Sequence, residues 1–230
     1  MLDKYLEILH QCKLFEDVQP QDIKAMLECL HPRMASFKKG EIAARNGEPM
    51  EGLGILLEGN LAVQKENSDG TRIILHIVLP GEMFGEIALF TEEMRWPATI
   101  AVLEDSVILF IPGDKIVGQC FQACSFHRRV TANMLKIVSE KALTLNRKVQ
   151  YLSIKGMREK LCTFFWELYK KNGKAMFRLP MNRNELADFL NVSRPSMSRE
   201  MCRMRDEGMI DFHLSTIKIL DKDKLAAFVQ

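Results

Sequence analysis

The sequence lacks the features that mark several large classes of protein. None of its apolar runs approaches the roughly 20 residues that a membrane-spanning helix needs. The first residues carry an acid at Asp3 and have neither the long apolar stretch nor the cleavage site of a signal peptide. We therefore expect a cytoplasmic protein that does not bind a membrane. No G-x-S-x-G, phosphate-binding loop or H-E-x-x-H motif is present, so the sequence does not predict an enzyme.

Histidine and cysteine are also arranged in ways that argue against a metal centre. The five histidines are too far apart to form the cluster of a metal enzyme, and none of the six cysteines forms a C-x-x-C pair. We expect no metal site, and we interpret most cysteines as small buried hydrophobic residues. Cys120 and Cys124 lie four residues apart and could share one helix face, so a thiol-redox response at this pair stays open.

The charges that are present are unevenly distributed. Net charge is only +2, but residues 155–205 contain 12 basic and 5 acidic side chains, against 17 and 20 in residues 1–154. A basic segment in an otherwise near-neutral chain is typical of a protein that contacts nucleic-acid phosphates. Solvated helices also collect lysine, so the charge supports nucleic-acid binding without establishing it. With 47% hydrophobic residues, the chain can bury a substantial core.

Apolar spacing and turn residues predict a fold of the α+β class. Residues 3–31 have helical spacing, and residues 33–112 consist of short apolar runs separated by glycine and proline turns. Asp69-Gly70 is the best hairpin signal, and it joins the apolar segments 61–65 and 72–78. Many short strands at regular spacing indicate a sandwich or a jelly roll.

Residues 126–152 contain no glycine or proline and predict one long helix. Apolar residues recur along it with 3-4-3-4-3 spacing, the pattern of a two-stranded coiled coil, which predicts a homodimer. A helix packed on its own domain is the alternative. The apolar seam consists of Leu135, Val138, Ala142, Leu145, Val149 and Leu152. We expect Gly156 to mark the end of this helix and a new helix to run from Arg158 to Lys171.

The region 179–219 has the pattern of two short helices and a hairpin. Asn182 can cap a helix that has Glu185 at its third position, a variant of the capping box. Asn191 then interrupts this helix, because asparagine tolerates the left-handed conformation that a tight turn requires. Together these residues predict the first helix and the turn of a helix-turn-helix.

The second helix has the two faces that a DNA-recognition helix needs. Methionines at 197, 201 and 204 form a stripe that we expect to be buried. The opposite face carries arginine forks that can read guanine, and hydroxyls that can hold phosphates. The predicted DNA-binding residues are Ser193, Arg194, Pro195, Ser196, Ser198, Arg199 and Arg203. Gly208 ends this helix, and the segments 209–212 and 216–220 predict a wing. An ordinary helical subdomain with exposed arginines is the alternative.

Five short motifs occur in a fixed order along the chain. They are Phe37-Lys-Lys-Gly-Glu, Gly47-Glu48, Leu57-Glu-Gly-Asn-Leu, Pro80-Gly-Glu-Met-Phe-Gly-Glu and Ser193-Arg-Pro-Ser-Met-Ser-Arg. In order and spacing they resemble the family of cyclic-AMP receptor proteins and fumarate-nitrate reduction regulators (CRP/FNR), over nearly all of the chain. A cyclic-nucleotide module without DNA-binding function would share residues 33–112 but would not need the pattern over 182–219.

The resemblance implies an architecture and a set of partners. It implies a double-stranded β-helix (a jelly roll of the cyclic-nucleotide-binding type) over 1–125, a dimerisation helix over 126–154 and a winged helix-turn-helix over 155–230. An effector bound beside the long helix would orient two recognition helices toward half-sites of a palindromic operator, ~34 Å apart. Double-stranded DNA, a second copy and RNA polymerase are the implied partners. Cyclic-AMP-type readers have glutamate where this chain has Pro195, so we expect a different operator.

The resemblance also identifies an effector pocket whose cyclic-nucleotide signature is incomplete. The glycine-glutamate pair corresponds to Gly85 and Glu86, but the position of the phosphate-binding arginine holds Trp96, followed by Pro97. Arg95 lies one residue early, and one step along a strand turns a side chain to the opposite face. A buried phosphate without its cation is unfavourable, so we do not expect cyclic AMP. A bulge that restores Arg95 would keep a cyclic nucleotide possible.

We expect instead an organic acid, an aromatic compound or another small metabolite, because Trp96 and Pro97 add apolar surface. The expected effector-binding residues are His76, Gly85, Glu86, Arg95, Trp96, Pro97, Leu145 and Asn146. For His76 a ligand or haem role stays open, but we favour an ordinary structural role. The cysteine cluster of oxygen-sensing relatives is absent, since only Cys12 and Cys29 lie near the N-terminus. Apart from an effector of unknown identity, no cofactor is expected.

Overall fold

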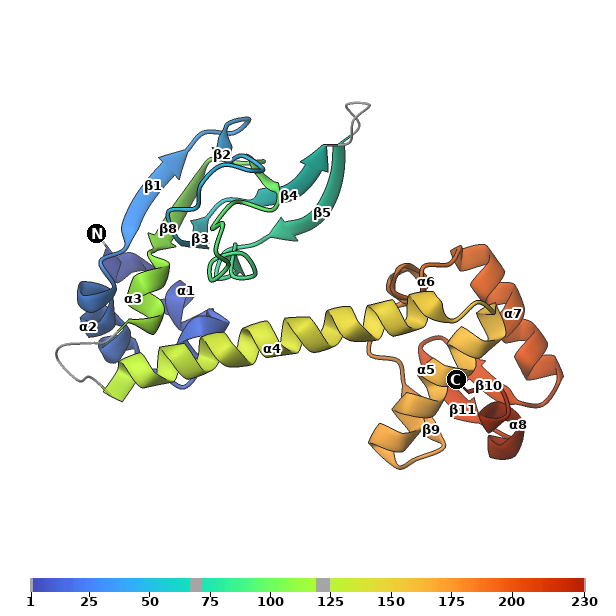
Figure 1. Ribbon diagram of the computed structural model, residues 1–230. Helices are drawn as coiled ribbons and strands as arrows, with labels where there is room; N and C mark the ends of the chain where they lie inside the picture. The colour runs from blue at the N-terminus through green and yellow to red at the C-terminus, as the bar shows by residue number, and fades with distance from the viewer. Residues whose placement is uncertain (1, 67–71, 119–124, 230) are drawn as a thin grey trace. The chain divides into compact units, whose positions relative to one another are not determined.

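The computed structural model describes residues 2–66, 72–118 and 125–229 (Figure 1). The chain forms two compact units, Met1–Glu140 and Lys141–Gln230, each with its own hydrophobic core. The Asp69-Gly70 turn and the Cys120/Cys124 pair lie outside the described residues. No helix in the described ranges is long and apolar enough to cross a membrane.

The N-terminal helical region is confirmed, but it is broken into short pieces. They are a 3₁₀ turn (Leu2–Tyr5), α1 (Leu6–Gln11), a second 3₁₀ turn (Lys13–Phe15) and α2 (Pro20–Leu30). The breaks have local causes. Cys12 adopts an extended conformation and Asp17 a positive φ of 61°, and neither can continue a helix. Pro20 then starts α2, where its missing N–H has little cost.

Two four-stranded antiparallel sheets follow, and they confirm the predicted jelly-roll-type domain and the α+β class. The first sheet has the order β1-β8-β3-β6 and the second the order β2-β7-β4-β5. Their bounds are β1 (Arg33–Phe37), β2 (Ile42–Ala44), β3 (Leu53–Glu58), β4 (Leu61–Glu66), β5 (Arg72–Val78), β6 (Met83–Phe84), β7 (Thr99–Val102) and β8 (Ser106–Ile111). The two apolar segments expected to form a hairpin are β4 and β5, which pair with a register shift between Val63 and Gln64.

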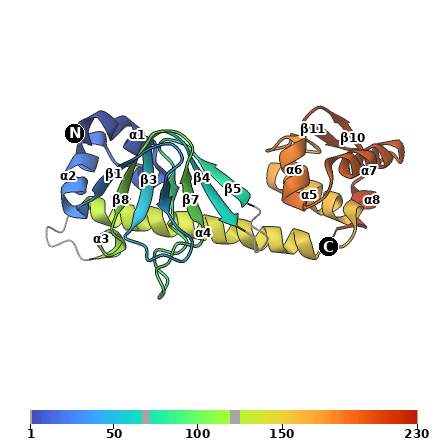
Figure 2. The same cartoon turned by 90° about the horizontal axis from the view of Figure 1, so that it is seen from above.

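Helices close one end of the two sheets. Figures 1 and 2 show α1, α2 and the short α3 (Gly113–Val117) gathered at the same end. The long helix α4 (Ser125–Ser153) begins and ends within one residue of the prediction. Its first part packs on the N-terminal unit, where Val130, Met134 and Ile137 are buried.

The C-terminal unit is a winged helix-turn-helix. Its elements are α5 (Met157–Asn172), β9 (Met176–Arg178), α6 (Arg183–Leu190), α7 (Arg194–Asp206), β10 (Ile210–His213), β11 (Thr216–Ile219) and α8 (Lys222–Ala226). The strands form an antiparallel sheet of order β10-β11-β9. Gly156 does not belong to the end of α4, which stops at Ser153; it is the N-cap residue of α5.

Candidate functional site

α6 begins with the capping box that the sequence predicts. The Asn182 side chain accepts hydrogen bonds from the backbone N–H groups of Asn184 (2.9 Å) and Glu185 (3.0 Å). In return, Glu185 Oε2 accepts from the backbone N–H of Asn182 (2.7 Å). The helix stops at Asn191, whose backbone is left-handed (φ 51°, ψ 57°). Both ends of the first helix are therefore set by local signals.

α7 begins at a capping serine and buries its methionine face. Ser193 Oγ accepts from the backbone N–H of Ser196 at 3.3 Å, and Pro195 lies in the first turn. On the inner face the thioether side chains are no more than 1% exposed, which confirms the buried stripe. These residues are Met197, Met201 and Met204. Burial of this stripe directs the arginine-bearing face to solvent.

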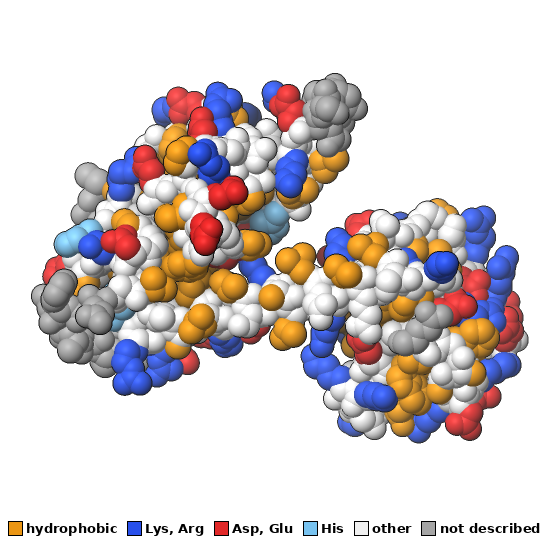
Figure 3. All heavy atoms as spheres, in the orientation of Figure 1, with side chains coloured by type: hydrophobic (Ala, Val, Ile, Leu, Met, Phe, Trp, Pro, Cys, Tyr) orange, Lys and Arg blue, Asp and Glu red, His pale blue; other side chains and the backbone are white. Residues whose placement is uncertain are grey.

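The outer face of α7 presents the residues predicted to contact DNA. Ser193, Arg194, Pro195, Arg199 and Arg203 are exposed, and Ser196 and Ser198 are half-buried. Arg199 Nη2 donates to Ser196 Oγ (3.2 Å), which also accepts from Ser193 Oγ (2.8 Å). These bonds hold a guanidinium near the helix N-terminus, where backbone N–H groups and the helix dipole favour an anion. Figure 3 shows Lys and Arg side chains over the C-terminal unit.

An ion-pair cluster that the sequence reasoning missed links α7 to α5. Arg158 Nε donates to Glu200 Oε1 (2.7 Å), and its two terminal nitrogens donate to the carboxylate of Glu207 (2.8 and 2.7 Å). Arg203 Nη1 donates to the other oxygen of Glu200 (3.3 Å). The hydrogen bonds from Arg158 lower the pKa of Glu207. The sequence did contain one signal for this cluster: Glu200 is an acid in the middle of a basic helix.

The wing is held by two arginines that stack on one aromatic ring. The guanidinium carbons of Arg183 and Arg205 lie 5.0 and 5.4 Å from the ring centroid of Phe212. Arg183 Nη2 also donates to the carbonyl oxygen of Leu214 (3.2 Å), and its Nη1 contacts the sulfur of Met201. Burial lowers the pKa of Arg183. Arg183 therefore connects the start of α6 to both α7 and the wing. The sequence did not indicate these contacts, since it shows only that Arg183 is the first residue of α6.

A buried lysine fixes the end of α6. Lys160, 6% exposed, donates from Nζ to the carbonyl oxygen of Leu190 at 2.9 Å. The last carbonyls of a helix lack intrahelical partners and carry partial negative charge, so a cation at this end satisfies both needs. Lys160 therefore positions the turn that leads to α7, whereas sequence analysis counted it only as part of the basic segment.

The expected effector residues of the N-terminal unit form two groups with different environments. Gly85 has a φ of 89°, and a Cβ there would lie 2.8 Å from Trp96 Cζ3 and 2.9 Å from Met50 Cε. Trp96 is only 5% exposed, and its ring centroid lies 5.8 Å from that of Phe84. Glu86 is also buried, at 3% exposed. We had expected the indole to form an open apolar wall of the pocket, but it is part of the hydrophobic core.

Arg95 and His76 are exposed instead. Arg95 does not lie in a strand, as the face argument assumed: it forms an isolated bridge with Pro49, and β7 starts only at Thr99. Even so, Arg95 and Trp96 face different environments, because Arg95 Nη1 donates to the carbonyl oxygen of Gly47 (2.7 Å). His76 lies on β5, with its Nε2 3.3 Å from Glu82 Oε2.

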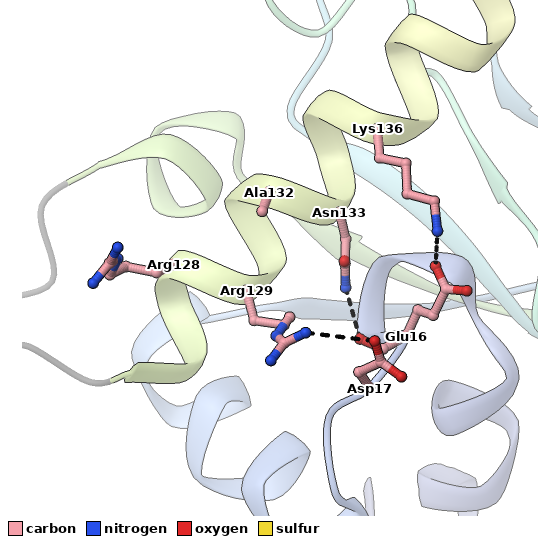
Figure 4. Close-up of a pocket in the computed structure, with 7 residues that line it drawn as sticks. All are labelled: Glu16, Asp17, Arg128, Arg129, Ala132, Asn133 and Lys136. Atoms are coloured by element: carbon pink, nitrogen blue, oxygen red, sulfur yellow. Dashed lines mark hydrogen bonds and ion pairs between the residues drawn. The ribbon is translucent and has the colours of Figure 1, made fainter.

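The remaining expected effector residues are Pro97, which is exposed beside Trp96, and Leu145 and Asn146, which are exposed on α4. The structure shows a hollow elsewhere, of about 530 Å³, where α4 meets the segment before α2 (Figure 4). It is lined by Glu16, Asp17, Arg128, Arg129, Ala132, Asn133 and Lys136. Asn133 donates to the carbonyl oxygens of Leu14 (3.0 Å) and Glu16 (2.9 Å), and Lys136 and Arg129 pair with Glu16 and Asp17. None of the expected effector residues lines this hollow.

The seam predicted for dimerisation is mostly exposed on α4. Leu135, Leu145, Val149 and Leu152 are 65%, 56%, 63% and 46% exposed, Ala142 is exposed and Val138 is half-buried. Exposed hydrophobic side chains on the middle of α4 are visible in Figure 3. A coiled-coil seam needs this exposure in a single copy.

The two buried cysteines, Cys12 and Cys162, are unreactive, and the described residues form no metal-ligand cluster. Burial raises the pKa of Cys12 to about 11 and that of Cys162 to about 12, so neither thiol is a reactive thiolate near neutral pH. No group of three His, Cys, Asp or Glu residues able to hold a metal ion occurs within residues 2–66, 72–118 and 125–229.

Comparisons with known proteins agree with both units. Residues 34–122 match the family model of the cyclic nucleotide-binding domain, and residues 159–228 match that of the Crp-like helix-turn-helix domain. The chain belongs to the CRP/FNR family of transcription regulators. The predicted resemblance is therefore confirmed.

Three similar proteins illustrate the family. The transcriptional activator protein FnrA of Stutzerimonas stutzeri is 26% identical over 212 residues, which cover 90% of this chain and 84% of FnrA. A CRP-like cAMP-activated global transcriptional regulator of Mycobacterium tuberculosis is 21% identical over 225 residues, or 96% and 97% of the two chains. The crystal structure of Thermus thermophilus catabolite activator protein has a TM-score of 0.53 at 19% identity and covers 94% and 97%, which supports the shared fold.

Membership of the CRP/FNR family establishes the general function of the chain. This CRP/FNR regulator is a DNA-binding transcription regulator with a cyclic-nucleotide-binding-like domain, and it is not an enzyme.

Proposed function

We propose that this CRP/FNR regulator binds a palindromic operator as a homodimer, through α7, under the control of a small effector in the N-terminal unit. The main support for this proposal is the outer face of α7, where Arg199 and Arg203 are exposed and each is hydrogen-bonded to a neighbouring side chain. Side chains that are already oriented lose little conformational entropy when they bind bases and phosphates. Three domains, 1–125, 126–154 and 155–230, would divide the tasks of sensing, dimerisation and DNA binding.

Arg199→Ala tests the DNA interface. An operator is first selected with the wild-type protein from a library of random duplexes. We expect the variant to lose about 10- to 100-fold in affinity for the operator, because a bidentate arginine–guanine pair contributes about 1–3 kcal/mol of discrimination. The control is Arg178→Ala, which removes the same charge from an exposed position on β9. Unchanged operator affinity in Arg199→Ala would exclude the assigned interface.

The dimer is tested on α4. Val149→Glu places a charge on the proposed seam, and Lys148→Glu changes charge at the neighbouring exposed position. We expect the wild type and Lys148→Glu to be dimers at micromolar concentration by light scattering, and Val149→Glu to be a monomer. A monomeric wild type would refute the proposal.

For the effector, we propose a small metabolite other than cyclic AMP. Arg95 supports this choice, because its guanidinium is bonded to the Gly47 carbonyl on the exposed side of the segment, while Trp96 occupies the core. Glu86, Arg95 and His76 could supply polar contacts, and Gly85, Trp96, Pro97, Leu145 and Asn146 remain the other predicted effector-binding residues. Thermal-shift titration against a metabolite panel tests this, since a ligand at 100 times its Kd adds about 2.7 kcal/mol.

A cyclic nucleotide is the second candidate effector. It is favoured by the match of residues 34–122 to the cyclic nucleotide-binding domain model and by the cAMP-activated relative. The same titration includes cyclic AMP and cyclic GMP. A shift with either nucleotide would show that Arg95 or another cation reaches the phosphate.

Two further elements complete the proposal. The DNA-bound dimer would act in the cytoplasm on RNA polymerase, which in vitro transcription from a promoter carrying the selected operator can test. A thiol-redox response at Cys120 and Cys124 is the remaining alternative. It is abandoned if the double serine variant and the wild type lose DNA binding equally on peroxide treatment.

A further inference from the structure

An acid lies in the middle of the recognition helix. Glu200 directly follows Arg199, and its side chain is only 12% exposed. A carboxylate at this position repels DNA phosphates, and its burial carries a desolvation cost in the folded state. It is compatible with the function of α7 only if a cation compensates it.

Arg158 supplies that cation from α5. Its guanidinium, 22% exposed, bonds Glu200 Oε1 at 2.7 Å through Nε and holds Glu207 with both terminal nitrogens. It also lies 5.4 Å from the ring centroid of Phe228. The planar guanidinium of arginine can bond two carboxylates at once, here those of Glu200 and Glu207, with a geometry that lysine cannot reproduce. Arg158 therefore binds both the middle and the end of α7.

The second oxygen of Glu200 faces the DNA-binding side. Glu200 Oε2 accepts from Arg203 Nη1 at 3.3 Å, and the Arg203 side chain is 71% exposed. One carboxylate is thus shared between a largely buried arginine and an exposed one. Because Arg158 fixes Glu200, Glu200 can in turn orient Arg203.

We propose that Arg158 is a positioning residue for DNA recognition, which neutralises Glu200 so that this carboxylate orients Arg203 without repelling the DNA backbone. The inference rests on the proposed DNA interface of α7. It assigns a role to two residues that the helix-turn-helix pattern does not identify, Arg158 and Glu200.

The test compares charge-changing variants of the full-length protein on one DNA probe. The probe is a fluorescent 30-base-pair duplex of random sequence, and anisotropy gives the Kd in 50 and 200 mM KCl. Arg158→Met leaves Glu200 uncompensated, Glu200→Gln removes the acid, and Arg158→Met/Glu200→Gln removes both charges. The control, Lys171→Met, removes a cation from the exposed far end of the same helix, about 20 Å from Arg158 along its axis.

We expect Arg158→Met to weaken random-DNA binding about fourfold and Glu200→Gln to strengthen it by a similar factor. This is about the factor by which one phosphate contact changes the Kd between 50 and 200 mM salt. The Kd of the double variant should return to within about twofold of the wild-type value. The Kd of Lys171→Met should also stay within about twofold, because Lys171 is farther than one Debye length from the Arg158 cluster. Glu200→Gln should also reduce discrimination between the selected operator and random DNA, because the amide has only one acceptor oxygen and cannot accept from both Arg158 and Arg203.

A purely structural role for Arg158 gives a different pattern. The double variant would then bind no better than Arg158→Met, and this result would overturn the inference. If Arg158→Met does not fold, Glu200→Gln decides alone, since its amide has the same shape; unchanged or weaker random-DNA binding refutes the inference. Failure of the wild type to bind the duplex would instead refute the proposed interface.

Discussion

The two units differ in how their candidate functional residues are held. In the C-terminal unit, Ser196, Arg199 and Arg203 stand on the outside of a helix whose start and buried face are set by nearby residues. In the N-terminal unit, Gly85, Glu86 and Trp96 lie in or beside the core, and their environment depends on residues far away in the sequence, such as Met50. Local rules therefore describe the DNA-binding surface well, whereas the effector region depends on packing.

Unfolding one unit alone tests most directly whether the two units are independent. Met204→Asp places a carboxylate at a position that is 0% exposed, within the hydrophobic core of the C-terminal unit, which should cost more than about 4 kcal/mol. We expect calorimetry to show loss of the C-terminal transition with the N-terminal one unchanged. Arg203→Asp, at an exposed site on the same helix, is the control. Loss or displacement of both transitions in Met204→Asp would mean that the units unfold together.

A matched glycine pair tests whether packing controls the effector region. Gly85 and Gly40 both have a φ of 89°, but only Gly85 has neighbours where a Cβ would be. Alanine at either position should cost about 1 kcal/mol in backbone strain, and Gly85→Ala about 1–2 kcal/mol more from crowding against Trp96 and Met50. Urea unfolding measures both. Equal losses would show that backbone conformation alone requires Gly85.

The capping box provides the corresponding test of local control. Asn182→Ala removes the acceptor of two backbone N–H groups, so it should destabilise the C-terminal unit by about 1 kcal/mol. Asn184→Ala, two residues on and also exposed, should have a smaller effect in the same urea measurement. If the two variants were equally stable, the cap would not determine the stability of α6.

The smallest expected effect is a pH dependence at Glu207. The hydrogen bonds from Arg158 lower its pKa below the ordinary 4.5, so the folded state favours the carboxylate. This stabilisation is present above about pH 4.5 and is lost as the pH falls through the lowered pKa. The difference in Tm between the wild type and Glu207→Gln should therefore shrink from pH 6 to pH 3. A constant difference would show that the Arg158 bonds do not depend on the charge of Glu207.

The class of the fold, the long helix, and the two helices, turn and wing hairpin of the DNA-binding unit were predictable from the sequence, whereas β9 and α8 were not predicted. These predictions succeeded because they used signals that act within a few residues: the asparagine cap, the left-handed Asn191 and the methionine spacing. The breaks within the N-terminal helical segment were not predicted, because the extended Cys12 and the positive φ of Asp17 are not evident from apolar periodicity.

Side-chain partners distant in sequence were not predictable in the same way. The Arg158 to Glu207 contact joins residues 49 apart, and Lys160 finds its partner 30 residues later. Trp96 was expected to add apolar surface to the effector pocket. No local feature of the sequence indicates that its indole lies beside the Phe84 ring and against Gly85. Such arrangements are decided by the tertiary fold, after local structure has been set.

The methionine face of α7 has a chemical consequence. Each of its three thioethers is at most 1% exposed, so an oxidant reaches them only when α7 separates from its core. Oxidation then adds a polar oxygen that the closed core cannot accommodate, and the opened form persists until a reductase repairs the sulfoxide. Burial of these thioethers therefore couples their oxidation to local unfolding of the DNA-binding unit.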